Sequence, residues 1–393
     1  MLRSAHGRAV AIVFTASGIV TGTLSSRWPW IAGRLHLTSA LVGAMGLAST
    51  AGALATMPFA ARFVHRYGTR AAIVFLTVAL GITLVFPPVA PTAIVLAVIM
   101  VVMGAVAGTQ DTAINTAGVE TETHLGRSIM SGLHGMWSVG VLLGALVGSV
   151  AARENIDPRI QFPVMGALII AGGLAAIAWL KGEPAASGAE DVHVPMFVWP
   201  RGLVLLIGLV AFAAIFVEFA AAAWAALFMH WTLHASQAEA ALTTAMFALA
   251  MAGGRLSGDA VVRCTGPVRA VRGCGVLATA GCLVVAVAPS DWVAIAGFIL
   301  IGLGVSVVVP LVFAAAGHSG PSPAMGVAGA ATVSYGAGLA APSVMGGVAD
   351  IASLRVSFAV TTVLAVGIFA GAGLLRRSGQ AAPELATAYG AEF

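Results

Sequence analysis

Long apolar runs, separated by short joints of polar, Gly or Pro residues, fill most of the 393-residue chain. The runs lack the alternation of polar and apolar positions that marks membrane β-strands, so they predict helices. At roughly 20 residues per membrane span, the chain predicts an all-α polytopic membrane protein with twelve transmembrane helices. We place these helices near residues 9–32, 40–61, 70–87, 92–120, 128–152, 160–180, 201–230, 238–258, 268–288, 291–316, 324–348 and 354–375.

A polar, Pro-containing segment at residues 181–200 separates the sixth predicted helix from the seventh. It divides the chain into an N-terminal six-helix bundle (1–180), a cytoplasmic linker (181–200), a C-terminal six-helix bundle (201–377) and a cytoplasmic tail (378–393). The two bundles also resemble one another at a shift of 198 residues, which aligns Gly68 with Gly266, Gly140 with Gly338, Gly148 with Gly346, and Trp137 with Tyr335. We predict a repeat of six plus six helices, with the binding site at the interface between the two bundles near the membrane midplane.

Composition supports the membrane assignment. The chain is 59% hydrophobic and only 9% charged, with mean hydropathy +0.99, whereas roughly 25% of residues are charged in soluble domains. The three cysteines have no metal-ligand spacing, and no phosphate-binding loop, zinc motif or nucleophile elbow occurs. We therefore expect no enzyme activity, no cofactor and no metal.

Lys and Arg predict the orientation. If the N-terminus is cytoplasmic, 14 of the 19 lie on the cytoplasmic side and 4 on the outer side, while Arg27 falls within a span. Positive charges favour the cytoplasmic side of membrane proteins, so we expect both termini there.

A cytoplasmic loop motif indicates a family. The segment ARFVHRYGTR at residues 61–70 resembles the G-x-x-x-D-R-x-G-R-R loop of the major facilitator superfamily. It matches that loop at Arg66, Gly68 and Arg70 and departs from it at Ala61, His65 and Thr69. The second half has GRLSGDAVVRCTG at residues 254–266, with Asp259 and Arg263. The resemblance covers essentially the whole chain and implies two six-helix bundles that work by alternating access.

Within this superfamily, DTAIN at residues 111–115 is similar to the fourth helix of the fucose-permease-like branch and of its poorly characterised bacterial members. That pattern is an acid, a few small residues, then Asn. Fucose permease has another acid in its first helix, where this chain has Arg27. The departure weakens the case for a sugar as the solute.

Asp111 is the first candidate for chemistry, because an ionisable group inside a membrane span predicts a solute or proton path. A carboxyl in a dry cavity can exchange protons at physiological pH, which would couple a proton gradient to the solute. The alternative is a permanent ion pair with Arg27. Arg27 cannot readily lose its charge, so it pairs with an acid or meets a polar or anionic solute; beside it, Trp28 is either a cavity wall or an interfacial anchor.

Glu218 is the second candidate for proton coupling, since it lies near the middle of the seventh predicted span. A neutral carboxyl bonded to a neighbouring helix is the alternative. Further solute contacts are predicted from amides, rings and a histidine on the same spans, each with helix packing as its alternative: Asn115, His134, Trp137, Trp224 and Tyr335.

Charged residues at helix ends and in the loops are predicted to form gate contacts rather than to bind solute. They are Arg66, Arg70, Glu120, Arg127, Asp259 and Arg263, and the loop glycine Gly68 is predicted to belong to the same gate.

These observations predict a monomeric secondary transporter of the bacterial inner membrane that carries a small polar or hydroxylated solute by proton symport, and an anionic or sugar-like compound is included in that class. Its partners are the solute, protons and the lipid bilayer, with no nucleic acid. A proton-driven exporter of amphiphilic compounds and a non-transporting receptor on a transporter scaffold remain alternatives.

Overall fold

The computed structural model describes residues 5–125, 129–177, 199–320 and 322–376. Arg127, the predicted tail and all of the predicted linker except residues 199 and 200 lie outside these ranges. Within them the elements are helical, and eleven helices are long and apolar enough to cross a membrane. Another helix, α13, has 29 residues and is about 44 Å long at roughly 1.5 Å per residue, so it is long enough to span as well. The twelve predicted spans are therefore present.

The N-terminal half contains six spans, the first of which is broken into two helices. Its elements are α1 (Ala5–Ser26), α2 (Trp28–Arg34), α3 (Ser39–Tyr67), α4 (Thr69–Thr83), the 3-10 turn η1 (Pro87–Val89), α5 (Ala93–Leu125), α6 (Met130–Arg153) and α7 (Pro158–Ile177). The break falls at Arg27, directly before Trp28 and Pro29, because proline has no N–H for the preceding turn.

The C-terminal half also contains six spans, and here the fourth is broken. Its elements are α8 (Gly202–Thr232), α9 (Gln237–Thr265), α10 (Pro267–Val287), α11 (Asp291–Val305), α12 (Val308–Gly317), α13 (Pro323–Ile351) and α14 (Leu354–Gly371). The break between α11 and α12 lies just before Pro310.

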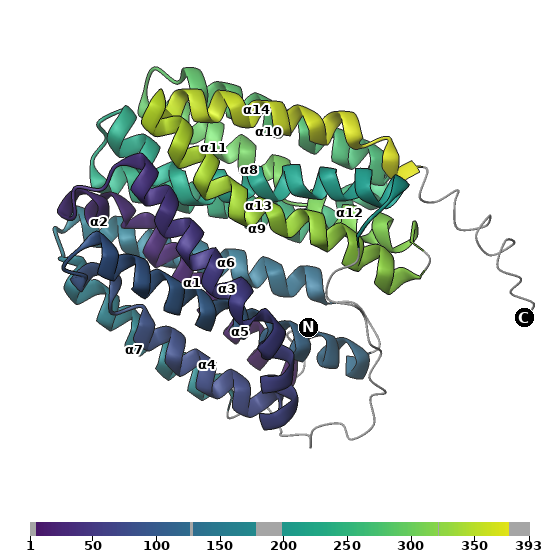
Figure 1. Ribbon diagram of the computed structural model, residues 1–393, viewed down its shortest axis with the longest axis horizontal. Coiled ribbons are helices and arrows are strands. Elements are labelled where there is room, and N and C mark those ends of the chain that lie inside the picture. Colours follow the sequence, from purple (N-terminus) through teal and green to yellow (C-terminus); the bar gives the residue numbers. More distant parts are fainter. Residues whose placement is uncertain (1–4, 126–128, 178–198, 321, 377–393) are drawn as a thin grey trace, which may run out of the picture.

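The two halves form separate bundles that lie side by side (Figure 1). Within the halves, α1 packs on α6 and α8 packs on α13. Between the halves, α3 packs on α13 and α9 packs on α6. In a repeat of six helices, α3 corresponds to α9 and α6 to α13. The two contacts between the halves are therefore equivalent to one another.

The repeat is also visible in the backbone of the short turns. Gly68, between α3 and α4, and Gly266, between α9 and α10, take left-handed φ values of +78° and +79°. Residues with a Cβ rarely adopt this conformation. The pair aligned by sequence therefore performs the same turn in both halves.

Arginines bind equivalent carbonyl groups in the two halves. The Arg34 guanidinium donates to the carbonyl of Ala90, and that of Arg355 donates to the carbonyl of Ala288 at 2.7 Å. Ala90 and Ala288 are themselves 198 positions apart. The two arginines satisfy carbonyls left open where a helix has ended, although one comes from α2 and the other from α14.

We call the end of the molecule that holds α2, the α6–α7 turn and the start of α9 the α2 end. The opposite end, with the start of α1, the α3–α4 turn and the end of α14, is the terminal end. Figure 1 shows the two bundles closest together at the α2 end and spread apart toward the terminal end.

Glycines make the contact between the halves close. A Cβ on Gly43 of α3 would lie 2.5 Å from the carbonyl oxygen of Pro342 in α13, and one on Gly346 would lie 2.6 Å from that of Ser39. Two hydrogen bonds join the halves nearby: Thr50 Oγ1 donates to Gly338 O at 3.1 Å, and Ser149 Oγ to Ala238 O at 2.8 Å. We call this backbone contact the seam.

Candidate functional site

Asp111 lies near the middle of α5, on the side that faces the other half of the protein. Its side chain is exposed, and it acts electrostatically on Tyr335 of α13, whose exposed fraction is 48%. Asn115 lies one turn further and donates its Nδ2 to the main-chain oxygen of Asp111 at 2.8 Å. No cation in the described part of the chain pairs with Asp111.

The described residues contain one carboxylate–guanidinium pair within the spans, between Arg255 of α9 and Glu218 of α8. Arg255 Nη2 lies 2.8 Å from Glu218 Oε1. Arg255 Nη1 donates to Ser138 Oγ of α6, also at 2.8 Å. One guanidinium thus binds a carboxylate of its own half and a hydroxyl of the other half.

Aromatic residues of α6 lie beside this pair. The guanidinium carbon of Arg255 is 6.0 Å from the ring centroid of Trp137, within reach of a cation–π interaction. His134, one turn away, is exposed and feels the charge of Arg255. Its ring meets that of Phe14 edge to face, with centroids 5.5 Å apart. His134, Trp137 and Ser138 therefore present one face of α6 to the other half.

Arg27 does not pair with Asp111. It is 3% exposed, and its Nη2 donates to the main-chain oxygen of Ile156 at 2.9 Å. Its Nε and Nη1 have no hydrogen-bond partner. Ser17 marks the level of Asp111 on α1, because it binds the neighbouring Gln110, and Arg27 lies ten residues further on, about 15 Å at roughly 1.5 Å per residue. The distance rules out the predicted alternative of an ion pair in this conformation.

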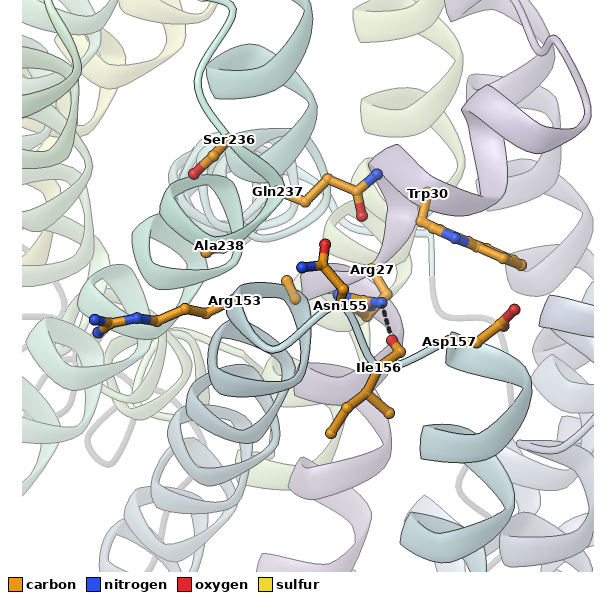
Figure 2. A pocket seen from close by; sticks show the side chains of 10 residues that line it. Arg27, Trp30, Arg153, Asn155, Ile156, Asp157, Ser236, Gln237 and Ala238 are labelled. Atoms are coloured by element: carbon orange, nitrogen blue, oxygen red, sulfur yellow. Dashed lines mark hydrogen bonds between the residues drawn. The ribbon is translucent and has the colours of Figure 1, made fainter.

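Arg27 instead lines a pocket of about 520 Å³ at the α2 end (Figure 2). The start of α9 contributes Gln237 to the lining, while Asn155 and Asp157 come from the α6–α7 turn. Figure 2 shows the hydrogen bond from the Arg27 guanidinium to the main-chain oxygen of Ile156. The Arg153 side chain points away from Arg27. The pocket therefore lies across both halves, outside the group around Asp111.

The predicted tryptophans divide into two groups. Trp28 is 6% exposed and Trp224 is 1% exposed, and both belong to the main hydrophobic core. This burial favours the packing alternative for them. Trp137 is half-buried beside Arg255 and remains a candidate for solute contact.

The predicted gate residues within the described ranges lie at the terminal end. The guanidinium of Arg66 rests 5.9 Å from the ring of Tyr67, and Glu120 accepts a hydrogen bond of 2.8 Å from Thr69. Arg70, Asp259 and Arg263 are exposed. The Glu120 contact links α5 to the α3–α4 turn within one half.

Arg255 and Ser138 are the site residues that sequence reasoning missed. Arg255 was grouped with the loop cations because it belongs to the second-half segment GRLSGDAVVRCTG. It lies inside the predicted span 238–258, however, and a cation there signals a partner within the membrane. That signal was available from the sequence.

Comparison with known proteins fits this architecture. The sequence profile of the Major Facilitator Superfamily matches residues 10–341. The chain belongs to the major facilitator superfamily. The resemblance found in the loop motif and the predicted twelve-helix fold are thereby confirmed, and the protein is a multi-pass membrane protein of a transporter family.

Relatives in this superfamily match along nearly their whole length. An uncharacterized MFS-type transporter of Yersinia pestis is 31% identical, over 93% of this chain and 94% of its own. An uncharacterized transporter of Sinorhizobium fredii is 32% identical, over 92% and 95%. Among solved structures, the nucleoside transporter NupG aligns with a TM-score of 0.71 at 13% identity, covering 96% of this chain and 98% of NupG. A bacterial homolog of the lysosomal transporter Spinster, inward-facing and unoccupied, aligns with a TM-score of 0.69 at 16% identity, over 94% and 97%. Likeness at these identities concerns the fold alone.

Proposed function

We propose that this protein is a proton-coupled symporter of the bacterial inner membrane that carries a small polar or hydroxylated solute. The observation that carries the proposal is Asp111, an exposed acid near the middle of a spanning helix, without a paired cation among the described residues. A carboxyl that holds no fixed partner is free to take up and release a proton as its surroundings change.

Asp111 is placed where the two halves meet. Its charge acts on Tyr335 across the space from α5 of one half to α13 of the other. A movement of the halves relative to one another would change the water and the polar groups around Asp111. Such a change gives the different proton affinities in two states that coupling requires.

Asn115 and Tyr335 supply hydrogen-bonding groups on either side of Asp111, and Trp137 supplies an aromatic face. A hydroxylated solute between the halves would meet donors and acceptors from both of them. We propose these residues, with His134, as its contacts.

The distribution of cations supports an orientation with the terminal end in the cytoplasm. Nine described arginines lie at the terminal end: Arg8, Arg62, Arg66, Arg70, Arg201, Arg263, Arg269, Arg272 and Arg376. Four lie at the α2 end: Arg34, Arg153, Arg159 and Arg355. By the positive-inside rule, the seam would then close the outer side. Alternating access would open the seam and close the terminal end.

Proton flux into proteoliposomes tests the proposal. The purified protein is reconstituted with an internal pH dye and supplied with sugars, sugar acids, small carboxylates or cationic dyes. We expect one class of solute to acidify the interior and make the outside alkaline. Dissipation of an imposed proton gradient by cationic dyes alone would instead identify an exporter.

Asp111→Asn separates coupling from solute movement. We expect this variant to lose pH-driven accumulation, by about 100-fold or more as for other lost proton-transfer groups, while solute exchange across the membrane continues. Thr109→Val, which replaces a polar side chain of α5 two residues from Asp111, serves as the control. Accumulation that persists in Asp111→Asn would remove Asp111 from the coupling role.

A further inference from the structure

Arg255 is held jointly by the two halves. Glu218, on its own half, supplies one oxygen at 2.8 Å, and Ser138, on the other half, supplies a hydroxyl at 2.8 Å. The ring of Trp137 covers the guanidinium from the side of α6. The side chains of Arg255 and Glu218 keep exposed fractions of 14% and 17%, so the pair is reachable rather than sealed.

This arrangement matches how proteins bind a carboxylate. A guanidinium offers several N–H groups in a fixed plane, and a carboxylate oxygen accepts them well. The Arg255 side chain gives one such bond to Glu218 and another to a neutral hydroxyl. A second carboxylate that entered between the halves could accept the same N–H groups, with Ser138 and Trp137 as its other contacts.

We propose that Arg255, Ser138 and Trp137 form a binding subsite for a carboxylate group of the transported solute, and that Glu218 occupies this subsite while the solute is absent. The inference rests on the proposed transport function and names its substrate class, a small organic anion. Glu218 is then a displaceable partner of Arg255, not a permanent one.

Charge balance links this exchange to a proton. When the solute carboxylate takes the N–H groups of Arg255, the hydrogen bond to Glu218 breaks and an equivalent bond to the solute forms. Glu218 would be left as an unpaired anion in a poorly hydrated site, which is unfavourable. One proton from the aqueous side, bonded to a Glu218 oxygen, removes that charge. One anion and one proton would therefore load together, with no net change of charge.

Few other ionisable groups could take the place of Arg255 beside Glu218. Of those on the helices packed against α8, Tyr335 of α13 lies mid-span, and Asp259 of α9 lies one turn after Arg255 and is exposed. His134 belongs to α6, which packs on α9, and it feels the charge of Arg255. The other described acids, arginines and histidines on the helices packed against α8 lie in first or last turns: His6, Arg8, Arg34, Glu239, Arg263, Asp291, Asp350 and Arg355. The proton would thus be taken up by Glu218 or shared with His134.

A vacant subsite can be made without knowing the natural solute. Glu218→Ala removes the resident carboxylate and leaves Arg255 in place, so free acetate should occupy the site and stabilise the protein. We expect saturating sodium acetate to raise the melting temperature of Glu218→Ala by about 2–4 °C more than that of the wild type. Acetamide and sodium chloride at equal concentration should not do so.

The controls locate the effect at Arg255. The double variant Glu218→Ala with Arg255→Gln should lose the acetate response, and Glu154→Ala, which removes an exposed acid elsewhere, should respond as the wild type does. An equal acetate response in the wild type and in Glu218→Ala would overturn the proposal. If Glu218→Ala does not survive purification, Glu218→Ser gives the same vacancy with a smaller loss of polarity.

The proposed function and this inference can fail separately. Acetate rescue without solute-driven proton movement for any compound would keep the carboxylate subsite and reject symport. Proton symport limited to uncharged sugars, with no acetate rescue, would keep symport and reject the subsite. Glucuronate and glucose form the matched pair of probes for that comparison, because they differ in one carboxylate.

Discussion

Of the arginines in the described ranges, Arg27 and Arg255 lie within the membrane region, and their surroundings differ. Arg255 binds a carboxylate, a hydroxyl and an aromatic face, contributed by both halves. Arg27 is more deeply buried, yet it makes one hydrogen bond, to a carbonyl of its own half, and leaves two nitrogens without a partner. The cation with the better partners is thus the one that contacts both halves.

This difference shows that the depth of burial alone does not indicate which arginine contacts both halves. Arg27 is held in one half by a contact that relative motion of the halves need not change. The contacts of Arg255 depend on the position of α6 relative to α8 and α9. A change of conformation will therefore be felt at Arg255 first.

The largest effect is expected when one partner of Arg255 is removed. Glu218→Ala leaves a largely buried guanidinium without its carboxylate. Loss of one partner costs about 3–5 kcal/mol of stability for a fully buried pair. We expect a value toward the lower end of that range, because the Arg255 side chain is 14% exposed. The double variant Glu218→Gln with Arg255→Gln removes both charges and should cost clearly less. Melting temperatures of the purified variants in detergent check this order. If the single and double variants melt together, Glu218 contributes no more than its packing.

A smaller effect is expected at Ser138. Ser138→Ala removes a hydrogen bond to a charged group, and such bonds contribute about 1.5–3 kcal/mol. Ser149→Ala removes a seam hydrogen bond between neutral groups, for which we expect about 1 kcal/mol. Both variants delete one hydroxyl between α6 and α9, so the difference in their melting temperatures measures the role of charge. Equal losses would show that Arg255 binds Ser138 no more strongly than a neutral donor would.

The smallest effect is expected at Arg27. Arg27→Met gives up one hydrogen bond but also relieves two buried nitrogens that have no partner, so the change in stability should stay within about 1 kcal/mol in either direction. Arg255→Met is the matched variant and should be destabilising by several times more. A loss at Arg27 as large as that at Arg255 would show that Arg27 has a partner at the α2 end, as a bound anion in the pocket would provide.

The sequence predicted the fold well because the fold depends on local properties. Apolar runs of span length predicted the twelve helices, and the break in the first span lies just before Pro29, which cannot continue the helix ladder. The alignment of Gly68 with Gly266 was matched by equal left-handed backbone conformations. These features are determined by residues close together in the chain.

The site was predicted less completely, because it depends on how helices turn toward one another. Glu218 and Arg255 are 37 residues apart on two different helices, and nothing in the sequence between them shows that their side chains meet. The burial of Trp224 likewise depends on which face of α8 meets the core. Asp111 could be found from the sequence because an acid within an apolar helix is unusual wherever it points.

The glycine contacts of the seam have a consequence for leakage. Where Gly43 meets Pro342 and Gly346 meets Ser39, backbone lies directly on backbone, with no flexible side chain between them. A closure made of side chains can open in small steps because the side chains can change rotamer. A contact of backbone on backbone is either fully formed or absent. This barrier should therefore act as an all-or-none switch, which would keep water and ions from slipping through a half-closed transporter between turnovers.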